Sequence, residues 1–234
     1  IEKRRWIIAD EDENPIVRAK KLSMGIGFSK KKFNVTIDAY MKEVGGITTR
    51  GQAFQNQFEF VKAVGDYDVK GVDVLVQKEW KGVTTWFGYS YARNKYDFKA
   101  LLPPVFPSNL DVSHSVQAAL TYKRKGLQVG IGVKYNTGKP FTAPLISTPV
   151  VGGEIVFDSP NTSRLPDYFK LDFSTTYMFD ISEKIRASMG ISIWNILNRE
   201  NVVNTYYVLL DGAPAIVQNK ALDLTPNVSF RVYF

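Results

Sequence analysis

The chain has 234 residues, of which 44% are hydrophobic and 23% are charged, and its net charge is +7 at pH 7. These values are close to the average of folded chains and exclude a disordered or collagen-like protein. The longest unbroken apolar run has five residues, Tyr206–Leu210. A membrane helix needs about 20, so helical spans are excluded. A transmembrane β-barrel is not excluded, because its strands alternate in polarity.

The positive charge has two interpretations, a solvated basic surface or an anionic partner. The basic blocks at 2–5 and 29–32 lack the interleaved aromatic residues of a nucleic-acid module, so no nucleic-acid partner is expected. There is no Cys, which excludes disulfides, zinc-thiolate sites and thiol nucleophiles. The chain begins at Ile1 without Met or a signal-peptide pattern, and we expect it to be a piece of a longer precursor.

Alternation of apolar and polar residues with a period of two dominates the sequence and indicates β-strands. In 127–135 one face carries Leu127, Val129, Ile131, Val133 and Tyr135. Such patterns predict about ten strands, at 1–9, 18–28, 33–44, 69–79, 83–95, 111–123, 127–137, 167–179, 185–197 and 226–234. All ten are 9–13 residues long, longer than the 5–6 residues typical of globular strands and near the roughly 9–11 residues of a tilted membrane-spanning strand.

The connections between these strands alternate in length along the chain. Tight turns are expected at 29–32, 81–82, 124–126 and 180–184, and long connections at 45–68, 96–110, 138–166 and 198–225. A membrane barrel has this pattern because its short turns face the periplasm and its long loops face outwards. Aromatic residues near the predicted strand ends favour a lipid-interface girdle. The mixed polar faces suit a wet lumen or a solvent-exposed surface equally.

Five segments resemble TonB-dependent outer-membrane receptors. They are Val69–Lys78, Asp111–Val116 leading to Tyr135–Phe141, Asn161–Asp172 with its Arg-Leu-Pro-Asp-Tyr run, Ile193–Asn201 with its Asn-Ile-Leu-Asn-Arg run, and the terminal Pro226–Phe234. The resemblance implies an all-β fold, an antiparallel transmembrane β-barrel of about 22 strands with a plug domain, of which this chain would be the C-terminal part. It also implies an outer membrane of a Gram-negative bacterium and nutrient uptake energised by TonB.

The same resemblance implies several partners: outer-membrane lipid and lipopolysaccharide, the TonB complex through a plug segment that has no counterpart here, and the barrel-assembly machinery. The assembly signal would be the alternating terminal residues Val228, Phe230, Val232 and Phe234. The ligand would be a siderophore, a saccharide or a peptide. Because loops carry binding chemistry more often than scaffold strands do, we predict ligand contacts by Arg50, Phe54, Phe58, Lys139, Arg164, Tyr206 and Tyr207.

Catalysis and metal binding find little support in the residues. His114 is the only His and has no partner at metal-ligand spacing, while the acidic run 10–13 fits a solvated turn better than a calcium site. No Gly-x-Ser-x-Gly elbow occurs. We therefore expect no enzyme, no cofactor and no metal. Two other classes remain open at this point, a passive porin or adhesin barrel and a soluble β-sheet protein.

Overall fold

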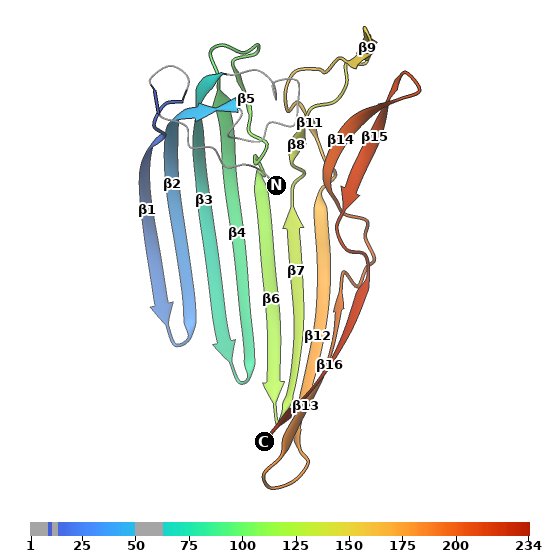
Figure 1. Cartoon of the computed structure of the whole chain (residues 1–234). Coiled ribbons are helices and arrows are strands. Elements are labelled where there is room, and N and C mark those ends of the chain that lie inside the picture. Colours follow the sequence, from blue (N-terminus) through green and yellow to red (C-terminus); the bar gives the residue numbers. More distant parts are fainter. Residues whose placement is uncertain (1–8, 11–13, 50–62) are drawn as a thin grey trace.

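The computed structural model of the chain describes residues 9–10, 14–49 and 63–234. In this part of the chain, nine long strands form one curved antiparallel sheet in the order β1-β2-β3-β4-β6-β7-β12-β13-β16 (Figure 1). Their bounds are β1 Arg18–Lys30, β2 Phe33–Thr48, β3 Val64–Trp80, β4 Val83–Asp97, β6 His114–Arg124, β7 Leu127–Asn136, β12 Tyr168–Asp180, β13 Arg186–Trp194 and β16 Thr225–Tyr233. No helix in the described residues has the length and apolarity needed to span a membrane.

These nine strands confirm nine of the ten predicted strands, and most of their ends differ from the predicted ends by two residues or fewer. The largest extensions are at the outer ends of β2 and β3, which reach Thr48 and start at Val64. The predicted strand at 1–9 lies almost entirely outside the described residues. The strand predicted at 185–197 ends earlier, at Trp194, because Asn195 adopts a left-handed conformation with φ 52° that breaks the extended backbone.

The two faces of the sheet differ consistently in polarity. One face carries residue pairs such as Ile37–Val74, Ile131–Phe173 and Ile191–Val228, each directly opposite across neighbouring strands. Side chains on this apolar face are open to the surroundings, with Ile131 45% and Val228 73% exposed. The other face carries polar pairs such as Gln117–Lys134 and Ser192–Asn227. An exposed apolar face beside a polar one is the arrangement of a membrane barrel with a wet lumen.

Three two-residue turns join the strands at one rim of the sheet, the lower rim in Figure 1. Both central residues of each turn have positive φ, Lys31 and Lys32 in the first, Lys81 and Gly82 in the second, Lys125 and Gly126 in the third. This is the type I′ geometry whose twist matches that of the flanking strands. At Gly126 an added Cβ would lie 2.4 Å from the Met178 carbonyl oxygen, so the turn also requires glycine for space.

The long connections lie at the opposite rim and contain short strands of their own. β5 (Val105–Pro107) extends the sheet beside β4, β8 (Pro140–Phe141) pairs with β11 (Ser163–Arg164), and β9 (Val150–Val151) pairs with β10 (Glu154–Ile155). The connection 198–225, for which no strand is predicted, holds a hairpin of β14 (Val202–Leu210) and β15 (Ala213–Lys220). A small core of Val44, Ile47, Ala63, Tyr96, Phe98, Leu101 and Phe106 closes this end of β2–β4.

Candidate ligand-binding region

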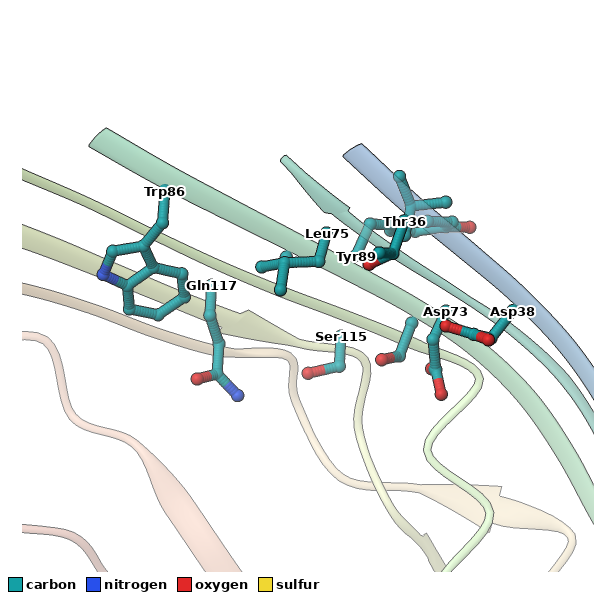
Figure 2. A pocket seen from close by; sticks show the side chains of 11 residues that line it. Thr36, Asp38, Asp73, Leu75, Trp86, Tyr89, Ser115 and Gln117 are labelled. Carbon is teal, nitrogen blue, oxygen red and sulfur yellow. The ribbon is translucent and has the colours of Figure 1, made fainter. Parts of the chain in front are cut away.

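A groove of about 350 Å³ lies on the polar face of β2, β3, β4 and β6. It is lined mainly by polar side chains, and Trp86 and Leu75 supply apolar surface. Figure 2 shows Asp38, Asp73, Ser115 and Gln117 on the same side of the sheet. The groove therefore offers hydrogen-bond acceptors, one amide and one indole ring within the barrel wall, a combination that suits a polar organic ligand.

Two carboxylates meet in this groove. Asp38 on β2 stands directly opposite Asp73 on β3. Among the described residues, neither of them forms an ion pair with Lys or Arg. Like charges directly opposite each other across two strands destabilise a sheet, so a cation or a hydrogen-bond donor placed between the two carboxylates would relieve their repulsion.

A clamp at the outer end of the wall is built around Arg164. Its guanidinium donates hydrogen bonds to the Asp111 and Gly138 carbonyl oxygens at 2.8 and 3.0 Å and pairs with the Asp111 carboxylate. Asp111, only 5% exposed, also accepts the Asn94 N–H at 2.7 Å. Buried Asn161 adds bonds from its amide to the Pro107 carbonyl and the Asn109 side chain. These contacts fasten the connection 137–167 to the connection between β4 and β6.

Asp167 holds together the two ends of the connection 137–167. Its carboxylate accepts a hydrogen bond from the Tyr135 hydroxyl at 2.7 Å and one from the Gly138 N–H at 3.1 Å. The Tyr135 bond, followed by the Gly138 bond, lowers the pKa of Asp167 below its usual value of 3.8. The lowered pKa of Asp167 therefore stabilises the folded protein fully at pH values above the ordinary pKa of the carboxyl group. This stabilisation is lost as the pH falls through the lower pKa that the group has in the folded protein.

The hairpin β14–β15 is held by asparagines. The backbone N–H of buried Asn195 donates a hydrogen bond to the Asp172 carboxylate at 2.8 Å. Its side-chain amide donates to the Arg199 and Leu222 carbonyls at 2.9 and 3.2 Å. The Asn201 amide donates to the Phe169 carbonyl at 2.9 Å, and its oxygen accepts the Phe169 N–H at the same distance. Hydrogen bonds thus hold the outer loops in place, and they come from residues of the Arg-Leu-Pro-Asp-Tyr run and of the Asn-Ile-Leu-Asn-Arg run.

The residues predicted to bind ligand have different positions. Arg50, Phe54 and Phe58 lie outside the described residues. Lys139 is half-buried beside the clamp, and Arg164 forms the clamp itself. Tyr206 is 42% exposed and Tyr207 is half-buried on β14, which lies against β10 of the connection that holds Lys139. The structure thus brings together the two outer connections that carry Lys139, Tyr206 and Tyr207. Contact between these three residues and a ligand stays a prediction.

The residues predicted to bind ligand do not include Asp38, Asp73, Ser115 or Gln117. The available signal was the presence of two carboxylates in the interior of strands, but their meeting depends on the register between β2 and β3. His114 donates or accepts a hydrogen bond with the Tyr89 hydroxyl at 2.9 Å through Nδ1. Within the described ranges, no three His, Asp or Glu side chains are grouped closely enough to hold a metal ion. Residues 11–13 of the acidic run lie outside those ranges.

Comparison with solved structures shows outer-membrane receptors with the same fold. The FrpB iron transporter from Neisseria meningitidis has a TM-score of 0.58 and 14% identity, with 97% of this chain and 33% of that chain covered. The FpvA receptor of P. aeruginosa, bound to pyoverdine, has a TM-score of 0.56 and 13% identity, with 96% and 29% covered. The ferric-catecholate import receptor Fiu from E. coli K12 has a TM-score of 0.56 and 12% identity, with 93% and 28% covered.

The chain thus spans a third or less of the length of these receptors. A search of curated proteins found no relative of the sequence. A family model described as "TonB dependent receptor-like, beta-barrel" matches residues 17–195, which include eight of the nine long strands in whole or in large part. Members of this family are outer-membrane transporters rather than enzymes. The chain therefore belongs to the TonB-dependent receptor family and forms part of its antiparallel outer-membrane β-barrel.

Proposed function

We propose that the protein takes up a scarce nutrient across the outer membrane with energy delivered by TonB. The observation that carries the proposal is the family match over residues 17–195. The polar lumen wall and the fastened outer loops support it, because a receptor needs a wet passage and loops held in place above it. The ligand classes that suit this chemistry are siderophores, saccharides and peptides, and the similar structures include a ferric-catecholate import receptor and a ferripyoverdine receptor.

Uptake measurements in intact cells test this proposal. Radiolabelled candidate ligands are offered to cells with and without the gene for the protein, in the presence and absence of TonB. We expect high-affinity binding in both backgrounds that contain the protein, and accumulation only where TonB is present. Accumulation that is linear in ligand concentration and independent of TonB would instead identify a passive porin.

Removal of the tip of the connection 137–167 is predicted to abolish ligand capture. Replacing residues 146–155 by Gly-Gly keeps the Leu145 N–H bond to the Val156 carbonyl and the β8–β11 pairing, so the base of the connection stays closed. Binding to intact cells is measured beside surface labelling of the same variant. Normal binding by the shortened protein would place the ligand on the lumen wall or on parts of the receptor outside this chain.

Deletion of Phe234 is predicted to lower the amount of barrel in the outer membrane. Val228, Phe230 and Val232 share the apolar face of β16, and Phe234, the residue that follows this strand, is 97% exposed. A side chain with so few contacts in the folded sheet has little to contribute to its stability, so a deletion effect would indicate recognition during assembly. Quantitative blotting of outer-membrane fractions measures it, and unchanged surface levels would contradict the assembly signal.

A further inference from the structure

The net charge of the chain is concentrated at the rim formed by the short turns. This basic rim comprises residues 30–32, 78–81, 123–125 and 180–186, which contain ten Lys and Arg but three Asp and Glu. Its net charge of +7 equals that of the entire chain, so the remaining residues are neutral as a group. In barrels of this kind the short turns face the periplasm, which places the charge at the periplasmic surface of the membrane.

The described residues neutralise little of this charge. Lys32 pairs with Glu79, and Arg186 pairs with Asp180 at 2.9 Å. In the part of the chain that the structure describes, the other eight cations of the basic rim form no ion pair. They are Lys30, Lys31, Lys78, Lys81, Lys123, Arg124, Lys125 and Lys184. The described side chains therefore leave the charge of these eight cations to be balanced by other groups.

Three of these lysines adjoin aromatic rings on the lipid-facing side. Lys30 on β1 and Lys78 on β3 are the cross-strand neighbours of Phe33 on β2. The Lys78 ammonium lies 5.5 Å from the centre of the Phe33 ring, and that of Lys81 lies 5.4 Å from the centre of the Trp80 ring. Trp80 is 62% exposed. Aromatic rings at this level mark the headgroup region of a bilayer, and lysine stems extend along apolar surface to place their charge there.

We propose that this corner of the basic rim binds the phosphate groups of anionic phospholipids in the periplasmic leaflet, with Lys30, Lys78 and Lys81 as its contacts. Lys30 and Lys78 are separated by two strand spacings, about 10 Å, with Phe33 between them. A lipid phosphate can sit against the two ammonium groups while its acyl chains cover Phe33 and the valines of β3. A soluble acidic protein cannot reach this position, because the apolar face beside it is covered by lipid.

Electron spin resonance of spin-labelled lipids tests the proposal on the protein purified from outer membranes and reconstituted in phosphatidylcholine. Spin-labelled phosphatidylglycerol and phosphatidylcholine report the relative affinity of the two headgroups for the barrel surface. We expect the wild type to prefer phosphatidylglycerol, and the triple variant Lys30→Gln, Lys78→Gln, Lys81→Gln to lose about fivefold or more of that preference. High salt should weaken the preference of the wild type.

The matched control removes the same charge from the polar face, where Lys21, Lys42 and Lys134 point into the lumen. The triple variant Lys21→Gln, Lys42→Gln, Lys134→Gln should keep the headgroup preference of the wild type. Equal preference in the wild type and the rim variant would overturn the proposal. Equal losses in both triple variants would also overturn it, because the effect would then follow total charge and not the site.

Discussion

Replacing Ile131 by Arg is expected to destabilise the barrel by about 2–4 kcal/mol, the cost of a charged side chain on the lipid face near the bilayer midplane. Ile131 lies at the centre of the ten-residue strand β7, between Leu120 on β6 and Phe173 on β12, and is 45% exposed on the apolar face. The measurement is the free energy of unfolding of the protein in lipid vesicles, obtained from denaturant titration.

The neighbouring position provides a matched control. Gly132 lies on the polar face opposite Asp172, and an added Cβ there has no heavy atom within 4 Å. Gly132→Arg therefore introduces the same side chain into the lumen, beside a carboxylate, and should leave the free energy of unfolding nearly unchanged. Equal losses at both positions would contradict the assignment of the two faces.

Replacing Arg164 by Ala is expected to loosen the connection 137–167 by about 2–3 kcal/mol, without unfolding the sheet. The change removes the bonds to the Asp111 and Gly138 carbonyls and leaves the Asp111 carboxylate without its cation, in a place where that side chain is only 6% exposed. Hydrogen exchange measures the effect directly. The amides of Leu165 and Asp158, which bond to the Lys139 and Ala143 carbonyls, should exchange faster.

Lys139→Ala is the control, because it removes a cation from the same connection and leaves its backbone bonds in place. Amide protection in this variant should equal that of the wild type. If Arg164→Ala keeps full protection and yet loses ligand binding, Arg164 would act on the ligand, as its place in the sequence predicts, and the clamp would be dispensable.

The sequence allowed the main sheet to be predicted, because alternation over nine or more residues specifies both a strand and its two faces. It did not reveal the hairpin β14–β15, although Asp211 and Gly212, with φ 50° and 77°, form a turn whose dipeptide is a strong hairpin signal. The prediction treats the whole connection 198–225 as a loop and therefore makes no use of the Asp-Gly dipeptide within it.

The candidate site was less accessible to prediction than the fold. Asp38 and Asp73 are 35 positions apart in the sequence, and their meeting depends on the register between β2 and β3, which includes an irregularity between Gly45 and Ile47. Arg164 was predicted as a ligand contact from its residue type and loop position alone. The sequence does not show that the Arg164 guanidinium already forms a hydrogen bond with the carboxylate of Asp111, which lies 53 positions earlier.

The hairpins nested in the outer connections also affect how the chain folds. Each long strand of the sheet pairs with the next long strand along the chain, and at two of these joints, β7 with β12 and β13 with β16, about 30 residues intervene. Closing a loop costs entropy that grows with the logarithm of its length. When β8 has paired with β11, and β14 with β15, about six and about eleven unpaired residues remain at these two joints, which reduces the entropic cost of closing each joint by roughly 1 kcal/mol. The nested pairings therefore let β12 and β16 join the sheet as if much shorter connections preceded them.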